Sequence, residues 1–246
     1  MKKDYSMKSR YNAESAVSVG NLVEGFPTDT YVRSLEDCLE GLEYKERLLL
    51  MTEKFNEFNY LSFQETMESV ISRLPSALPT DAGSVVKYIH VSVIVKYVEI
   101  FGQPYPEDSL KYMKELTKRN TCEHAVRPFL NKHYDLTYSN VLKWCDNKSF
   151  HVRRLASESI RPFLPWSPNF RPYVENPAPI IPVLDKLYND DSLYVRRSVA
   201  NNLNDISKIS SNLALECSER WLKNDDSDKV HYVVKHGLRT LNKTSK

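Results

Sequence analysis

The apolar residues of this 246-residue chain recur at the spacing of amphipathic helices. In "YKERLLLMTEKFNEF" and "SVVKYIHVSVIVKYVEIF" an apolar residue returns every three or four positions, which places these residues on one side of a helix. The alternation of apolar and polar residues that marks a half-buried strand is nearly absent. Prolines separate the apolar segments. The pattern predicts an all-α fold, with helices near residues 31–42, 44–58, 62–74, 84–101 and 109–119.

Short strings recur along the same chain. "RPFL" occurs at Arg127–Leu130 and again at Arg161–Leu164, 34 residues later. "HVRR" and "YVRR" lie 43 residues apart, and "YVVKHGLRTL" follows after a further 38. Periods of this length in a helical chain indicate paired helices stacked as a HEAT-like repeat α-solenoid. We expect one such domain over residues 28–246, while residues 1–27, with weak periodicity, either join its first helices or are poorly ordered.

The repeated Val-Arg-Arg strings place polar groups on one wall of this solenoid. Four positions of "VRRLASESIR" are expected to face the core: Val152, Leu155, Ala156 and Ser159. A different face carries Arg154, Glu158 and Arg161 at helical spacing. The corresponding stripe of the next repeat consists of Arg197, Asn201 and Asn204, with Asp205 at its edge. The repetition therefore predicts arginine, carboxylate and amide groups along one concave face.

Each of these polar groups also has a purely structural interpretation. The Arg that directly follows the Val, here Arg153 or Arg196, usually binds an Asp or a carbonyl of a neighbouring repeat. Glu158 could serve only to pair with Arg161. Asp205 could be a turn residue that binds local amides. An Asp in the turn before "YVRR" is expected to cap the helix that follows.

The net charge of +2 conceals an uneven distribution of charge. Residues 229–246 hold five Lys or Arg and no acid, and residues 153–171 hold four Arg against one Glu. Basic surface of this kind is typical of proteins that bind nucleic acid. We expect the concave face to be basic and to contact DNA through Arg154, Arg161, Arg197, Lys235 and Arg239.

Several other classes of protein are disfavoured by the sequence. No run of 18 apolar residues is present, so no membrane association is expected. The N-terminus lacks the apolar region of a secretory signal, and four scattered cysteines fit reduced thiols, so we expect a cytoplasmic protein. His and Cys show no metal-ligand spacing, and no Gly-rich phosphate loop or serine nucleophile motif occurs, so neither metal nor cofactor is expected.

A Trp lies in the proline-rich stretch "FLPWSPNFRPYVENPAP". The prolines between residues 162 and 182 predict an extended, rigid loop rather than a helix. Trp166 could only pack there, but an indole held on a rigid loop beside carboxylates is also suited to binding a cation.

The strings "CEHAVRPFL", "HVRRLASESIRPFLPW" and "YVRRSVANNLNDISK" resemble the AlkC branch of the AlkC/AlkD family of DNA alkylation repair glycosylases. The resemblance extends from about Leu35 to Leu241 and is strongest between Thr121 and Asp205. Many AlkC relatives continue into an immunoglobulin-like C-terminal domain, so the chain resembles a shorter form of the family that lacks it.

The resemblance implies a monofunctional DNA glycosylase of base excision repair, with no catalytic Lys and no lyase activity. It would remove cationic N3-alkylated bases from duplex DNA without flipping the base. The implied substrate is 3-methyladenine, with 3-methylcytosine as a further candidate. Carried over by motif, the catalytic carboxylates fall on Glu123, Glu158 and Asp205, and the aromatic residue beside the lesion on Trp166. The expected partner is alkylated double-stranded DNA, bound by a monomer.

These residue types suit that chemistry. An N3-alkylated base is cationic and leaves without protonation, and the deoxyribose then acquires oxocarbenium character. Carboxylates aimed at the sugar stabilise this charge, and one can position the attacking water. Two alternatives remain: a non-catalytic HEAT-repeat protein that binds distorted or branched DNA, and a protein-binding HEAT scaffold.

Overall fold

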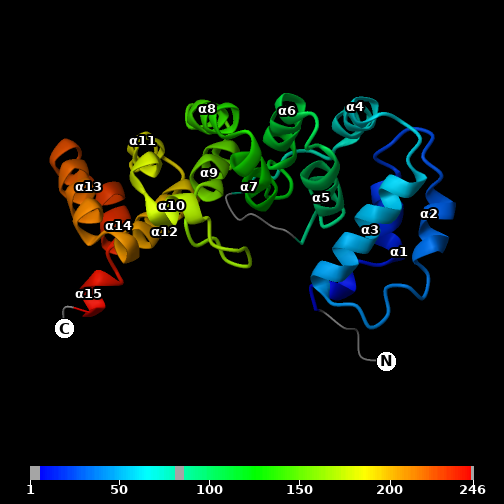
Figure 1. Cartoon of the computed structure of the whole chain (residues 1–246), viewed down its shortest axis with the longest axis horizontal. Coiled ribbons are helices and arrows are strands. Elements are labelled where there is room, and N and C mark those ends of the chain that lie inside the picture. Colours follow the sequence, from blue (N-terminus) through cyan, green and yellow to red (C-terminus); the bar gives the residue numbers. More distant parts are fainter. Residues whose placement is uncertain (1–5, 81–85, 245–246) are drawn as a thin grey trace. The chain divides into compact units, whose positions relative to one another are not determined.

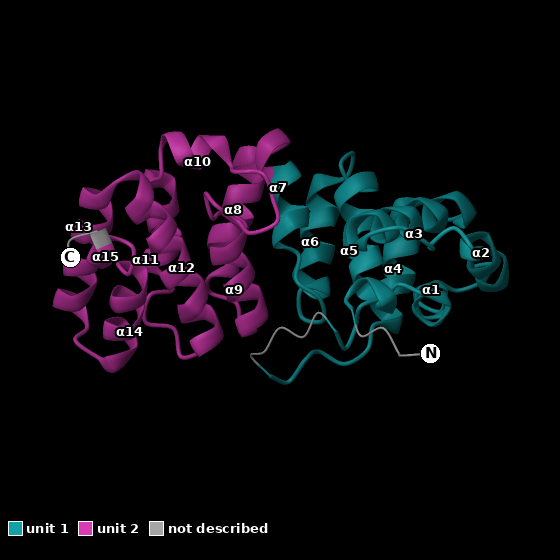
Figure 2. Ribbon diagram, turned by 90° about the horizontal axis from the view of Figure 1, so that it is seen from below, with its two compact units in different colours: residues 1–129 teal, residues 130–246 magenta. Residues whose placement is uncertain are grey.

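The computed structural model describes residues 6–80 and 86–244. Over these residues the chain forms α-helices and two short 3₁₀-helices and contains no strand (Figure 1). The all-α prediction is therefore confirmed. The chain divides into two compact units, residues 1–129 and 130–246 (Figure 2). None of the helices in the described part of the chain is long and apolar enough to cross a membrane.

Unit 1 contains the first six α-helices and most of the seventh. Their bounds are η1 Lys8–Arg10, α1 Ala13–Gly20, α2 Thr28–Leu35, α3 Tyr44–Phe58, α4 Phe63–Arg73, α5 Val91–Phe101, α6 Pro106–Leu116 and α7 Glu123–Lys132. Helix α2 packs on α1 and α3, and α3 packs on α5. Aromatic side chains fill the space between them, with Tyr31, Phe55 and Tyr97 all buried. Paired helices thus share one apolar core.

Residues 6–27 of the N-terminal segment contain η1 and α1. Helix α1 begins with a capping box, in which Asn12 and Ser15 each accept a hydrogen bond from the backbone amide of the other. Ala16 and Val19 of this helix are fully buried. This part of the segment therefore packs within unit 1.

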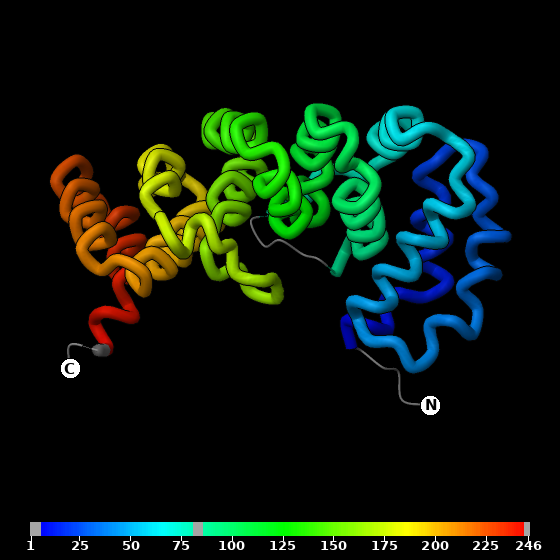
Figure 3. Tube along the Cα trace, in the orientation of Figure 1, coloured from blue at the N-terminus to red at the C-terminus, as the bar shows by residue number. Residues whose placement is uncertain are grey.

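Unit 2 is likewise built of helices that pack on one another (Figure 3). Its elements are α8 Tyr134–Trp144, α9 Phe150–Ser159, α10 Arg171–Glu175, η2 Ala178–Ile180, α11 Ile181–Asp185, α12 Leu193–Ile209, α13 Ser211–Asn224, α14 Asp228–Gly237 and α15 Leu241–Thr244. Helix α12 packs on α9 and on α14, while α8 packs on α9 and α13 on α12. Both Val-Arg-Arg strings lie in the first turn and a half of a helix, α9 or α12, as predicted.

The proline-rich segment differs from its prediction. Residues 162–170 are not helical, but α10, η2 and α11 form within the stretch expected to be an extended loop. Each of these three short helices has a proline in its first turn. Proline is tolerated there because the amides of the first turn have no partner within the helix. Prolines therefore start helices in this segment as well as ending them.

The turns before α9, α12 and α14 share one hydrogen-bond pattern. In each, a side-chain oxygen accepts from the backbone amide of a Ser two residues later: Asn147 from Ser149 at 2.9 Å, Asp190 from Ser192 at 2.8 Å and Asp225 from Ser227 at 3.0 Å. The prediction that an Asp caps the "YVRR" helix is wrong: the N-cap residue is Ser192, with no side-chain cap hydrogen bond, and Asp190 instead orders the turn before it.

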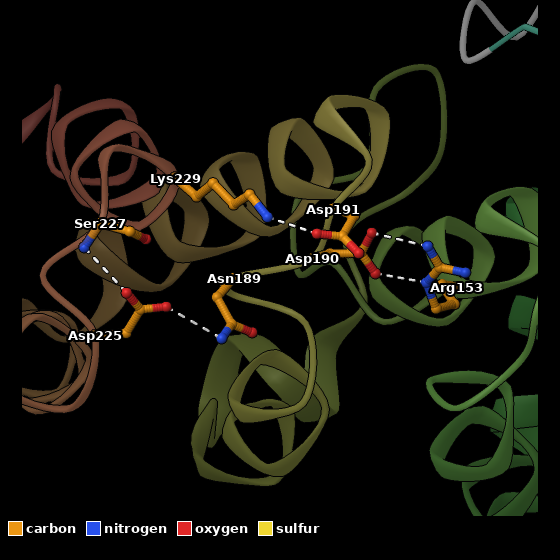
Figure 4. A pocket seen from close by; sticks show the side chains of 7 residues that line it. All are labelled: Arg153, Asn189, Asp190, Asp191, Asp225, Ser227 and Lys229. Carbon is orange, nitrogen blue, oxygen red and sulfur yellow. Dashed lines mark hydrogen bonds and ion pairs between the residues drawn. The ribbon is translucent and has the colours of Figure 1, made fainter.

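Ion pairs connect these turns from one repeat to the next (Figure 4). Arg153 of α9 donates from Nε to Asp190 Oδ2 at 2.5 Å and from Nη2 to Asp190 Oδ1 at 2.9 Å. Lys229 Nζ lies 2.5 Å from Asp191 Oδ1. We call this group the turn cluster: Arg153, Asn189, Asp190, Asp191, Asp225, Ser227 and Lys229. The structural interpretation of Arg153 is confirmed, since its guanidinium is committed to the turn of the neighbouring repeat.

Candidate active site

Glu158 lies at the end of α9 and is 5% exposed. Its Oε1 accepts a hydrogen bond from Arg161 Nη1 at 2.7 Å, and its Oε2 accepts one from Ser198 Oγ at 2.6 Å. Arg154 Nη2 lies 3.6 Å from Oε1. Burial opposes the charge of Glu158, but the two arginines and the hydrogen bonds outweigh burial, so the pKa of this carboxyl is lowered. Glu158 is therefore ionised and held from both oxygens.

Asp205 lies inside α12, and its side chain is 2% exposed. Its Oδ2 accepts a hydrogen bond from Arg161 Nε at 2.9 Å, whereas its Oδ1 lies 3.4 Å from Lys208 Nζ. Burial raises the pKa of Asp205, and the charges and hydrogen bonds of Arg161 and Lys208 only partly oppose this effect. The alternative of a turn residue is wrong, because α12 continues for four residues beyond Asp205.

Arg161 joins these two carboxylates. It follows the end of α9 by two residues, and its guanidinium binds Glu158 of its own repeat and Asp205 of the next one. The two negative charges raise the pKa of Arg161 despite its burial, so it stays protonated. We call Glu158, Arg161 and Asp205 the Arg161 triad. The sequence left open whether Glu158 only pairs with Arg161 or also has a catalytic role. The structure shows the pair. The buried guanidinium favours an internal role over the predicted DNA contact.

The face of α12 that meets α9 carries small polar side chains. Ser198 binds Glu158, and Asn202 donates from Nδ2 to the Ser157 carbonyl at 2.9 Å. With Asp205 these residues follow the i, i+4, i+7 spacing of one helix face. The predicted stripe of Arg197, Asn201 and Asn204 thus lies one residue away from the face that contacts α9. Ser198 and Asn202 were not predicted, although their spacing with Asp205 was the available signal.

Asn204 also differs from its predicted place on an open wall. It is buried, and its Oδ1 accepts a hydrogen bond from Thr240 Oγ1 at 2.9 Å. Asn201, partly exposed, accepts one from Arg239 Nη2 at 3.2 Å. Asn204 therefore connects neighbouring repeats instead of facing solvent.

Trp166 projects from unit 2 on the segment between α9 and α10, where its side chain is 86% exposed. A hydrogen bond from the Phe170 amide to the Pro162 carbonyl, 3.0 Å long, closes this segment at its base. Trp166 has a φ of 66°. A bulky side chain in this left-handed region costs roughly 1–3 kcal/mol, and such strain is concentrated at functional sites. The segment thus holds an indole in the solvent at the expense of backbone strain.

Four further cations were predicted to contact DNA. Arg197, Lys235 and Arg239 are exposed on unit 2. Arg154 is only partly exposed, with its guanidinium 5.0 Å from the centroid of the Tyr194 ring and near Glu158. The first three are thus accessible to a polyanion, whereas Arg154 also forms part of the surroundings of Glu158.

Glu123 is the first residue of α7 and belongs to unit 1, whereas the Arg161 triad and Trp166 belong to unit 2. Its side chain is buried, and so is that of Cys122 before it. Burial is the main reason why the pKa of the Cys122 thiol is raised well above its ordinary value. Glu158 and Asp205 lie close together, because both bind Arg161. Glu123 belongs to unit 1, so its predicted place beside these two carboxylates stays a prediction.

Lys208 and Phe163 complete the surroundings of Asp205, and neither was predicted. Lys208 Nζ lies 5.7 Å from the centroid of the Phe163 ring, which belongs to the segment that leads to Trp166. No group of three His, Cys, Asp or Glu side chains within the described ranges is placed to hold a metal ion. The groups present can offer carboxylate oxygens to a positive charge that develops on a bound molecule.

Comparisons with known proteins show what the whole chain is similar to. No family model matches the chain. The chain is 35% identical over 209 residues to the uncharacterized protein YhaZ of Bacillus subtilis (strain 168). The aligned region covers 81% of this chain and 58% of YhaZ. Its structure is similar to the Pseudomonas fluorescens alkylpurine DNA glycosylase AlkC bound to DNA containing an abasic site analog, with a TM-score of 0.82 and 27% identity. That match covers 96% of this chain and 64% of AlkC, so the chain spans less than two thirds of either relative.

Proposed function

This chain belongs to the AlkC branch of the AlkC/AlkD superfamily of HEAT-like repeat proteins, and from that premise we propose that it is a DNA glycosylase. It excises cationic N3-alkylated bases from duplex DNA, 3-methyladenine first and 3-methylcytosine as a further candidate. The observation that carries the proposal is the Arg161 triad, in which carboxylates from adjacent repeats share one arginine. The segment that presents Trp166 begins one residue after Arg161.

The chemistry needs little from the protein. The alkylated base carries a positive charge and departs as a neutral molecule, leaving an oxocarbenium-like sugar. Carboxylate oxygens of Asp205 and Glu158 stabilise this charge and position the attacking water, while a role for Glu123 of unit 1 stays a prediction from the resemblance. The exposed face of Trp166 attracts the cation by ~0.5–2 kcal/mol. The protein acts as a monofunctional enzyme on an unflipped base and uses neither metal nor cofactor.

Selectivity follows from the same modest apparatus. A neutral base is a poor leaving group, and the proposed site contains no separate acid assigned to protonate it. Exposed Arg197, Lys235 and Arg239 bind backbone phosphates, which gives affinity without sequence preference. Arg154 is assigned to the same role beside Glu158.

A second candidate is a non-catalytic protein that binds distorted or branched DNA. One observation favours it: Glu158 and Asp205 are both buried in ion pairs, an arrangement that purely structural carboxylates also adopt. Only the glycosylase is expected to release a base from DNA, whereas both candidates are expected to bind DNA.

The test is release of free base from methylated duplex DNA by the wild-type protein. We expect 3-methyladenine to appear in the soluble fraction while the abasic strand stays intact. Release of 3-methylcytosine is measured in the same way, with a duplex that contains a single 3-methylcytosine. Tight binding of the same duplexes with no release above the spontaneous background would reject the enzyme and leave the DNA-binding candidate.

A further inference from the structure

Arg161 contacts three different parts of the candidate site. Its Nε donates to Asp205 Oδ2 at 2.9 Å and its Nη1 to Glu158 Oε1 at 2.7 Å. Its Nη2 lies 3.5 Å from the carbonyl oxygen of Phe163. The two carboxylates belong to neighbouring helices, and Phe163 belongs to the segment that carries Trp166. Because a guanidinium is planar and rigid, these contacts fix the three acceptors relative to one another.

The two carboxylates differ in how fully they are held. Both oxygens of Glu158 accept short hydrogen bonds, one from Arg161 and one from Ser198. In Asp205 only Oδ2 is held in this way. Its Oδ1 has a 3.4 Å contact with Lys208, whose side chain is 42% exposed. An exposed lysine at this distance is a weak partner. Oδ1 of Asp205 is therefore the least firmly held of the four carboxylate oxygens of these two residues.

Charge alone does not account for an arginine in this place. A cation beside two carboxylates weakens their attraction for a second cation, which an oxocarbenium-stabilising site has to provide. The bonding geometry does account for it, because Arg161 occupies Oδ2 of Asp205 and leaves Oδ1 with only the long contact to Lys208 among the described residues.

We propose that Arg161 is a positioning residue of the excision reaction, which anchors Glu158 and orients Asp205 so that Oδ1 meets the sugar cation. This inference rests on the proposed function. It replaces the direct DNA contact that the sequence predicts for Arg161. Glu158 acts mainly through Arg161, and Asp205 is the carboxylate that touches the substrate.

The ionisation of Asp205 depends on the same contact. Its charged neighbours are Arg161, which also binds Glu158, and Lys208 on its own helix. Burial raises the pKa of Asp205, and Arg161 opposes this rise. A Lys at position 161 keeps the charge but loses the rigid fork, and a Gln loses both. The acid limb of the rate profile is expected to move to higher pH in Arg161→Gln.

The experiment compares Arg161→Lys with Arg153→Lys, a matched control from the other end of the same helix pair. Each arginine joins α9 to an Asp of the next repeat, but Arg153 binds Asp190 in the turn cluster. Single-turnover excision of 3-methyladenine, the Kd for the same duplex and the thermal midpoint are measured for both. We expect excision by Arg161→Lys to slow by ~10–100-fold, as is typical when an orienting partner is lost. Its Kd stays within about twofold of wild type, and the folded fraction of Arg153→Lys excises at the wild-type rate.

Other results would overturn the inference. A wild-type rate in Arg161→Lys would do so, and so would weaker DNA binding with an unchanged rate for bound substrate, which would mark a DNA contact. If Arg161→Lys does not fold, Ser198→Ala is the second variant, because it removes only the hydrogen bond to Glu158 Oε2. It should slow excision without moving the acid limb, and a wild-type rate in Ser198→Ala would reject the anchoring of Glu158.

The two failures can be told apart. A wild-type protein without excision activity contradicts the proposed function, whereas an active wild-type protein with a normal Arg161→Lys variant contradicts only this inference.

Discussion

Two arginine–aspartate pairs join α9 to the repeat that follows it, one near each end of the helix. Arg153 and Asp190 lie in the turn cluster, before α12 begins (Figure 4). Arg161 lies past the end of α9, and Asp205 lies late in α12. Both aspartates are largely buried, with side-chain exposures of 6% and 2%. An ion pair between repeats is thus common to both regions and does not by itself mark a site.

The difference lies in how the carboxylate oxygens are used. Asp190 accepts from Arg153 on both oxygens, and Oδ1 also accepts from the Ser192 amide. Asp205 shares its arginine with a second carboxylate, and among the described residues its Oδ1 contacts only Lys208. The turn cluster uses its hydrogen-bonding capacity to fix a turn, whereas one oxygen of the Arg161 triad is less firmly held, and we assign that oxygen to the substrate. That difference separates a structural pair from the proposed catalytic one.

The largest expected effect is on excision by Asp205→Asn. Losing one preorganised charge at an oxocarbenium-like centre typically costs ~10²–10³ in rate. Because burial raises the pKa of Asp205, the neutral amide is tolerated in its place, so the thermal midpoint should change less than in Asp190→Asn. Single-turnover kinetics and thermal unfolding measure the two quantities. Near wild-type excision by Asp205→Asn would make this pair as structural as the turn cluster.

Asp190→Asn should produce the opposite pattern. It breaks the bidentate pair with Arg153 and weakens the bond to the Ser192 amide, so we expect unfolding to become easier by ~2 kcal/mol. Urea unfolding measures this loss. Excision per folded molecule should stay within about twofold of wild type, and a deficit as large as that of Asp205→Asn would remove the distinction between the two regions.

Trp166→Ala tests the strained segment next to the Arg161 triad. Loss of a cation–aromatic contact of ~0.5–2 kcal/mol corresponds to a decrease of about 2–30-fold in excision. Stability should not change, since the indole is exposed. Tyr60→Ala is the matched control, because Tyr60 is 83% exposed on unit 1 and has no assigned role. Equal effects of the two substitutions would argue against a specific contact by Trp166.

The smallest expected effect concerns affinity. Arg197→Ala should weaken binding of methylated and unmethylated duplexes alike by a few-fold and reduce the salt dependence by about one phosphate contact. Lys186→Ala, which removes an exposed lysine paired with Asp146, should leave both unchanged. Titrations at several salt concentrations measure these effects. A loss confined to methylated DNA would place Arg197 at the lesion instead of the backbone.

The sequence predicted the all-α class and part of the site, but α2 ends at Leu35, short of the predicted residue 42, and α5 begins only at Val91, inside the predicted range 84–101. The Val-Arg-Arg strings marked α9 and α12, and their spacing correctly grouped Arg154, Glu158 and Arg161. It did not predict which face of α12 meets α9, because periodicity relates residues within one helix and does not fix its rotation against a neighbour. Adjacent residues lie about 100° apart around a helix. The predicted stripe was displaced by one residue, so it contained Arg197 and Asn201 where the structure has Ser198 and Asn202.

Prolines were the second source of error. "RPFL" occurs twice, yet Pro128 lies inside α7, while Pro162 follows the end of α9. Whether a proline is compatible with a helix or ends it depends on its position in the helix and on the hydrogen-bond partners of the preceding carbonyl groups. A string of four residues contains neither piece of information.

The most direct test of the catalytic role of Asp205 is the pH dependence of 3-methyladenine release under single-turnover conditions, with spontaneous release subtracted. Our proposal requires Asp205 to be ionised for excision, and burial raises the pKa of this carboxyl. The rate should therefore fall, as the pH decreases, at a higher pH than an ordinary aspartate would give, and this acid limb should be absent from the residual rate of Asp205→Asn. An acid limb that persists unchanged in Asp205→Asn, or a wild-type protein that releases no base at any pH, would contradict the account.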